Sequence, residues 1–184
     1  KIHLEDIKIE DLEEIYPKAS EIYQQDEEFK SKAQNINKEL NENKDDLIKN
    51  WEFLKEISVK AIKETLSLLG HNFDLWMGES DVNTLIPKMI ADLKENEKIS
   101  LDDGAYISNL ETDPRILITK SDGSYLYLTT DLATVLNRKK EYEVDKTLYI
   151  VDKRQKLHFK QLFDSIKYFK FGEDEYTHVE FGTI

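Results

Sequence analysis

Three side chains in the second half of the chain could bind one polar ligand together: the phenol of Tyr127, the carboxylate of Asp131 and the carboxamide of Gln155. Between them they offer one negative charge and both hydrogen-bond donors and acceptors. Simpler interpretations exist, because Asp131 can be a carboxylate at a helix start and Tyr127 an ordinary strand aromatic. Their position favours binding, because open α/β sheets bind ligands at the carboxyl ends of their strands.

The first element that would position these side chains is a predicted β-hairpin. Residues 116–120 alternate in polarity, Asp122-Gly123 supplies a tight turn, and residues 125–129 are rich in aromatic residues and threonine. Apolar residues then recur at helical spacing. We therefore expect Tyr127 to close a strand and Asp131, together with the two preceding threonines, to cap the next helix.

A second junction of this kind follows. Residues 147–151 form a short apolar run of the buried-strand type, and a helical pattern begins after Gln155 and continues to Phe169. Two strand ends could thus present Tyr127, Asp131 and Gln155 to one crevice.

Several ordered motifs in the chain closely resemble arginyl-tRNA synthetase, a class I aminoacyl-tRNA synthetase. They are Lys-Ser-Asp-Gly-x-x-x-Tyr-x-Thr-x-Asp-Leu-Ala (120–133), Tyr-Ile-Val-Asp-x-x-Gln-x-x-His-Phe (149–159) and His-x-x-Phe-Gly (178–182). Phe73-Asp74, Gly78-Glu79-Ser80 and Asp103-Gly104-Ala105 resemble earlier blocks in the same order. The resemblance covers essentially the whole chain and is strongest from Trp51 to Ile184.

The resemblance implies roles for individual residues. In that family the tyrosine, the aspartate four positions on and the later glutamine line the arginine pocket, which implies Tyr127, Asp131 and Gln155 here. A carboxylate such as Asp131 suits the planar guanidinium fork. His158 and Gly182 are the candidates on the ATP side, although His158 can also be a helix-start histidine and Gly182 a strand bulge.

The implied reaction is adenylation of arginine by ATP with Mg²⁺, followed by transfer to tRNA(Arg). The family's His-x-Gly-His-type motif has no match among the histidines at positions 3, 71, 158 and 178, and its Lys-Met-Ser-Lys-type loop would follow residue 184. The helical anticodon-binding domain is also missing. We therefore expect an internal fragment of the catalytic domain, inactive by itself, and its non-Met first residue fits this expectation.

Composition limits the possible functions. With 184 residues, the chain has no cysteine and a net charge of −12, which excludes disulfides and argues against broad nucleic-acid binding. We expect a cytoplasmic protein without a transmembrane helix. Two basic clusters, residues 138–140 and residues 153–154 with Lys156, could contact tRNA. They are more simply interpreted as solvated cations near helix ends.

For the fold, we expect an α/β class: part of a doubly wound Rossmann-like catalytic domain, with an inserted antiparallel meander and a preceding helical segment. The helical segment is 1–70, with a helix capped by Asp26 and another ended by Gly70. The partial catalytic domain is 71–184. It contains hairpins at about 98–129, strands at 73–77, 147–151 and 178–184, and Glu79 as a helix-start cap.

Two further expectations concern the chain by itself. Since it would lack flanking sheet strands, we expect exposed apolar edges and, as a result, either marginal stability or self-association. The alternative to a synthetase fragment is a non-catalytic acidic α/β domain that binds a nucleotide or an amino acid.

Overall fold

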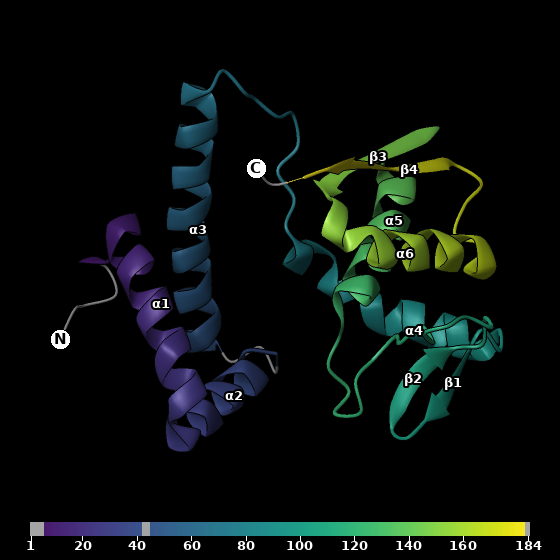
Figure 1. The fold of residues 1–184 in the computed structure, drawn as a ribbon, viewed down its shortest axis with the longest axis horizontal. Coiled ribbons are helices and arrows are strands. Elements are labelled where there is room, and N and C mark those ends of the chain that lie inside the picture. Colours follow the sequence, from purple (N-terminus) through teal and green to yellow (C-terminus); the bar gives the residue numbers. More distant parts are fainter. Residues whose placement is uncertain (1–5, 42–44, 183–184) are drawn as a thin grey trace. The chain divides into compact units, whose positions relative to one another are not determined.

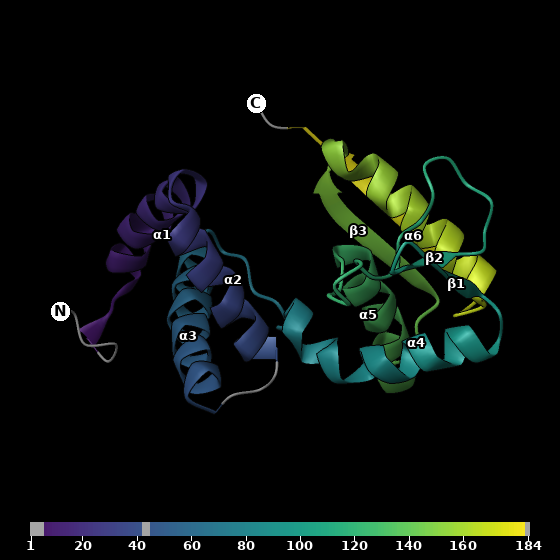
Figure 2. The same ribbon diagram turned by 90° about the horizontal axis from the view of Figure 1, so that it is seen from below.

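The structure is a computed structural model that describes residues 6–41 and 45–182. It divides into two compact units, Lys1–Leu75 and Trp76–Ile184 (Figures 1 and 2). This division does not test whether residues 71–184 are a partial catalytic domain, and that assignment stays a prediction.

The first unit is helical, as predicted. It contains α1 (Ile9–Gln25), α2 (Glu27–Asn41) and α3 (Asp45–Leu68). Asp26 caps α2, because its carboxylate accepts hydrogen bonds from the backbone N–H groups of Glu28 and Phe29 at 2.9 and 3.0 Å. At the end of α3, Gly70 adopts a φ of 74°, and the N–H of His71 reaches back to the carbonyl of Leu66. Both predicted helix boundaries are therefore confirmed.

The predicted strand at 73–77 is wrong. Within the part of the chain that the structure describes, this segment pairs with no strand, and Phe73 and Leu75 are more than half exposed. Short apolar runs predict a strand only where a neighbour supplies the ladder, and none does so here.

The second unit begins with two consecutive helical elements, the 3₁₀ helix η2 (Glu79–Leu85) and α4 (Ile86–Glu95). Pro87 would be unfavourable in the interior of a single long helix. The change from η2 to α4 resolves this, because Pro87 lies in the first turn of α4, where its missing N–H is not needed.

Of the predicted meander, only the first hairpin forms. β1 (Ile99–Asp102) and β2 (Ala105–Ser108) pair in antiparallel register. The second predicted hairpin is reduced to the isolated bridge Thr119–Tyr125, and a further bridge, Ile107–Leu117, joins its first arm to β2.

The remaining elements are α5 (Tyr127–Glu141), β3 (Lys146–Asp152), η3 (Lys153–Gln155), α6 (Lys156–Phe169) and β4 (Glu175–Phe181). β3 and β4 pair in parallel, which confirms the strand predicted at 147–151. The strand predicted at 178–184 begins earlier, at Glu175, and its last two residues lie outside the described range. This mixed helix and strand architecture agrees with the predicted α/β class.

Figures 1 and 2 show α5 and α6 on one side of the β3–β4 pair. On that inner face the ring of Tyr149 packs against Phe159 and Phe163 of α6, with centroids 4.9 and 5.7 Å away. The outer face carries large exposed side chains: Leu148, Ile150, Val179 and Phe181. The 147–151 run is therefore covered on one face only, whereas its continuous apolar pattern predicted burial on both.

One hydrophobic core fixes α5 and α6 relative to η2 and α4. Its fully buried members include Val82, Ile86, Ile116, Ile118, Leu132 and Leu162. The start of α5 and the start of α6, which carry the candidate residues, are therefore held by packing.

Candidate functional site

The start of α5 differs from the prediction. Tyr127 is the first residue of the helix rather than the last of a strand, and Leu126 is the N-cap. Thr129, fully buried, accepts a hydrogen bond from the N–H of Leu126 and donates one to the carbonyl of Ile118. The β-propensity of the tyrosine- and threonine-rich run suggested a strand, but burial of Leu128 and Thr129 one turn before Leu132 extends the helical face backwards.

Asp131 consequently lies in the second turn of α5 and does not cap it. Its carboxylate oxygen Oδ2 is 2.7 Å from the Nε2 atom of His158, in the first turn of α6. The two side chains are 31% and 25% exposed, so solvent or a ligand reaches them from one side. The structure thus joins a residue predicted for arginine with one predicted for ATP.

Tyr127 and Gln155 flank this pair along the two helices. Tyr127 precedes Asp131 by four positions on α5, and Gln155 precedes His158 by three at the start of α6, so each lies on the same helix face as its partner. Both side chains are exposed, Tyr127 by 72%. The structure therefore brings Asp131 and His158 into contact, whereas Tyr127 and Gln155 lie at the starts of the same two helices with their side chains open to solvent.

Glu79 is a further acidic residue at this place, and sequence reasoning assigned it only a capping role. The cap belongs instead to Asp81, whose carboxylate accepts from the N–H of Gly78 at 2.8 Å. Partial burial raises the pKa of Glu79, and the negative charge of Asp131 raises it further. The sequence indicates this arrangement, because Asp81 stands three residues after Gly78, at the position that suits a capping carboxylate. The carboxylate of Glu79 is then not needed for the cap.

The phenol of Tyr149 lies within electrostatic reach of Asp131. Burial raises its pKa, Arg138 opposes that rise, and Asp131 adds to it. Arg138 lies over the ring, with its guanidinium carbon 5.6 Å from the centroid, and Nη1 is 3.4 Å from the hydroxyl. Arg138, one of the cations considered for tRNA binding, therefore packs against Tyr149 within the fold.

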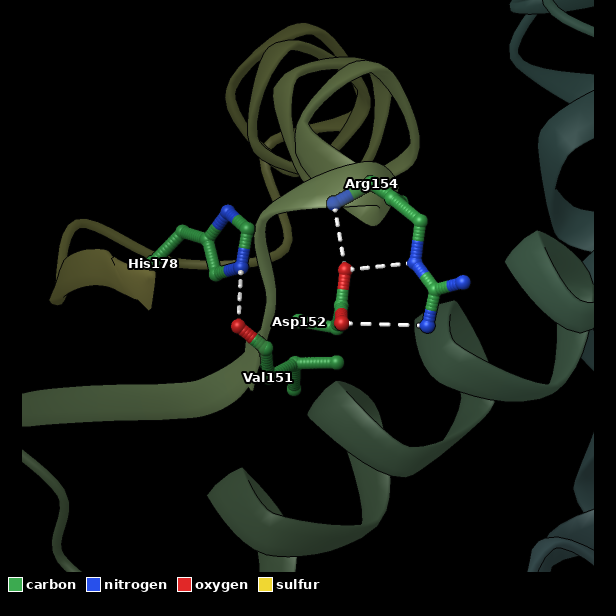
Figure 3. Close-up of polar contacts among 4 residues, drawn as sticks. All are labelled: Val151, Asp152, Arg154 and His178. Carbon is green, nitrogen blue, oxygen red and sulfur yellow. Dashed lines mark hydrogen bonds and ion pairs between the residues drawn. The ribbon is translucent and has the colours of Figure 1, made fainter. Parts of the chain in front are cut away.

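The end of β3 carries a second polar cluster, drawn in Figure 3. Asp152 accepts hydrogen bonds from the backbone N–H, Nε and Nη2 of Arg154, at 2.8 to 3.1 Å. These bonds lower the pKa of Asp152. Lys156 pairs with Glu180 at 3.0 Å, so two cations of the second basic cluster are neutralised locally. On the neighbouring strand, the Nε2 atom of His178 is 3.1 Å from the carbonyl oxygen of Val151.

Gly182 directly follows β4. The atoms nearest to a Cβ at this position would be those at the end of the Lys153 side chain, at 3.5 to 3.9 Å. The nearest group on that side of Gly182 is therefore a flexible cation, which could move aside or pair with an anionic ligand that approached the backbone.

Two negative findings apply to the residues described, 6–41 and 45–182. No cluster of three or more acidic or histidine side chains there could hold a metal ion. Nor is any of their helices long and apolar enough to cross a membrane.

The sequence matches the family described as tRNA synthetases class I (R), catalytic domain, over residues 2–184. The chain belongs to this family. Membership in the class I synthetase family agrees with the resemblance seen in the motifs and favours a synthetase segment over a free-standing binding domain.

Individual class I (R) synthetases show the same likeness. The arginine–tRNA ligase of Francisella tularensis subsp. holarctica is 38% identical over 97% of this chain, and that of Alkaliphilus oremlandii is 39% identical over 96%. The crystal structure of arginyl-tRNA synthetase from Plasmodium falciparum covers 89% of the chain at 25% identity with a TM-score of 0.73. The chain spans only 31% of the length of the two curated relatives and 30% of the solved chain.

Proposed function

We propose that these 184 residues form part of an arginine–tRNA ligase, and that the Asp131 region binds the guanidinium group of arginine. The observation that carries the proposal is the accessible Asp131 carboxylate, which is 31% exposed and held 2.7 Å from His158, with the acidic Glu79 within electrostatic reach of it. A bound cation reduces the repulsion between two neighbouring carboxylates. A planar guanidinium has five N–H donors, enough to hydrogen-bond to both carboxylates.

The neighbouring groups complete the assignment. The exposed phenol of Tyr127 would accept one more guanidinium N–H from the same face of α5. Gln155, at the start of α6, has both donor and acceptor atoms for the α-amino or α-carboxylate group. Arginine would thus lie across the starts of two helices that the core holds in place.

On the ATP side we propose Gly182, with the ammonium of Lys153 beside it, as the place where the nucleotide approaches the backbone. His158 was the other candidate predicted from the sequence, but its contact with Asp131 supports a different role, argued below. ATP would arrive as its Mg²⁺ complex. The whole protein would then transfer arginine to tRNA(Arg), a reaction of protein synthesis that belongs in the cytoplasm.

The test uses the full-length protein and compares arginine with citrulline, which has nearly the same shape but a neutral urea group. We expect efficient charging of tRNA(Arg) with arginine and weak competition by citrulline, roughly 100-fold poorer, because its neutral urea group offers no counter-charge to Asp131 and Glu79. Equal inhibition by citrulline would show that the site does not recognise charge and would overturn the assignment.

A further inference from the structure

We propose that His158 is a positioning residue that orients the Asp131 carboxylate toward the guanidinium of arginine. This inference rests on the proposed function of the site. Its basis is the 2.7 Å separation between Nε2 of His158 and Oδ2 of Asp131, a distance typical of a strong hydrogen bond to a carboxylate.

The contact leaves the carboxylate able to bind a ligand. Because an ionised carboxylate can only accept, the imidazole donates its Nε2–H to Oδ2. The Oδ1 atom and a second lone pair of Oδ2 stay available for a planar fork of N–H donors. Without the imidazole, a side chain that is one-third exposed could rotate freely and would lose entropy when it bound arginine.

The imidazole itself is presented from a rigid base. The next residue, Phe159, is 5% exposed, and its ring contacts Tyr149 and His178, with centroids 4.9 and 4.6 Å away. The His158 ring meets that of Phe159 edge-on at 5.1 Å. Packing of Phe159 therefore restricts the movement of His158, and such restriction keeps a binding site in its productive geometry.

Electrostatics argue against direct contact of His158 with ATP phosphates. A triphosphate that approached the imidazole would also approach Asp131, whose negative charge also acts on Glu79. The repulsion would oppose binding, whereas a guanidinium meets attraction from both carboxylates.

The experiment compares two variants in the full-length protein: His158→Ala, which removes the donor, and His158→Gln, whose side-chain amide can donate from nearly the same place. The KM values for arginine and for ATP are measured, with the inhibition constant of agmatine, which is arginine without its carboxylate. For His158→Ala we expect the arginine KM and the agmatine constant to rise together by about 10–100-fold, since a hydrogen bond to a charged group is lost. His158→Gln should restore both to within about threefold of the wild type.

Two results for His158→Ala would overturn the inference. One is a higher KM for ATP with an unchanged agmatine constant, which would show that His158 contacts the nucleotide. The other is a lower melting temperature with no change in the arginine KM or the agmatine constant. Lys160→Ala is the matched control, because it removes a side-chain donor two positions further along α6 that pairs with Asp164 at 2.9 Å, and its agmatine constant should stay normal. Asp131→Asn separates the two proposals. If it leaves agmatine binding intact, the proposed function itself fails; if it weakens agmatine binding and His158→Ala does not, only the role of His158 fails.

Discussion

Asp131 in the second turn of α5 and His158 in the first turn of α6 meet at 2.7 Å, although 27 positions separate them in the chain. Their contact depends on the packing of the two helix starts on one core, through Leu132 on one side and Phe159 on the other. A charge that is to recognise a ligand is therefore placed by tertiary packing and not by a local turn.

Asp131→Asn in the full-length protein should lower kcat/KM for arginine by roughly two to four decades. The substitution keeps the size of the side chain but leaves the guanidinium without its counter-charge, a loss of about 3–5 kcal/mol for a partly buried pair. Steady-state aminoacylation measures the change.

Tyr127→Phe provides the comparison for Asp131→Asn. It removes one neutral hydrogen bond and should cost only about 0.5–1.5 kcal/mol. A near-normal arginine KM in Asp131→Asn, combined with greater damage in Tyr127→Phe, would contradict the placement of the guanidinium at Asp131.

Glu79→Gln should stabilise the ligand-free protein at neutral pH while weakening arginine binding by about tenfold. The folded-state pKa of Glu79 is raised above the ordinary value of 4.5, so the free energy of unfolding falls as pH rises through that raised pKa. The variant should therefore melt at a higher temperature than the wild type at about pH 8, and at nearly the same temperature well below pH 4.5, where Glu79 is protonated in both the folded and the unfolded protein. If calorimetry at about pH 8 showed that Glu79→Gln melts at a lower temperature than the wild type, the like-charge pairing of Glu79 with Asp131 would be contradicted.

The 184-residue chain by itself should not support arginine-dependent exchange of pyrophosphate into ATP. Its sequence contains neither the His-x-Gly-His-type nor the Lys-Met-Ser-Lys-type motif that handles the phosphates in this family. The assay must include tRNA(Arg), because the family normally requires it, and the full-length protein is the positive control. Robust exchange by the short chain would show that phosphate contacts reside within these residues.

The short chain should also self-associate through the outer face of the β3–β4 pair. Ile150 and Val179 lie opposite each other in register and are 68% and 40% exposed, and among the described residues each strand pairs on one edge only. The double substitution Ile150→Lys and Val179→Lys should shift sedimentation toward monomer. Leu157→Lys, on α6 and 51% exposed, is the control that adds charge elsewhere. A chain that stays monomeric at all concentrations would contradict this prediction.

Motif spacing in the sequence was sufficient to select Asp131 and His158 as candidates, but not to place them. Local propensity misassigned the start of α5, because a run such as Tyr125–Thr129 favours strands until Thr129 and Leu128 are buried on a helix face. The role of Glu79 was missed for a related reason. Its interaction with Asp131 links η2 to α5, and periodicity within one element carries no information about such a contact.

The hydrogen bonds of Thr129 with Leu126 and Ile118 determine where residues can be inserted or deleted before α5. The exposed turn at Asp122 and Gly123 lies before Leu126, so residues added or removed there leave the register of α5 intact. Between Leu126 and Asp131 the backbone is helical, and one inserted residue would rotate the carboxylate by about 100° around the helix axis. Insertions should thus be tolerated on one side of Leu126 and abolish ligand recognition on the other.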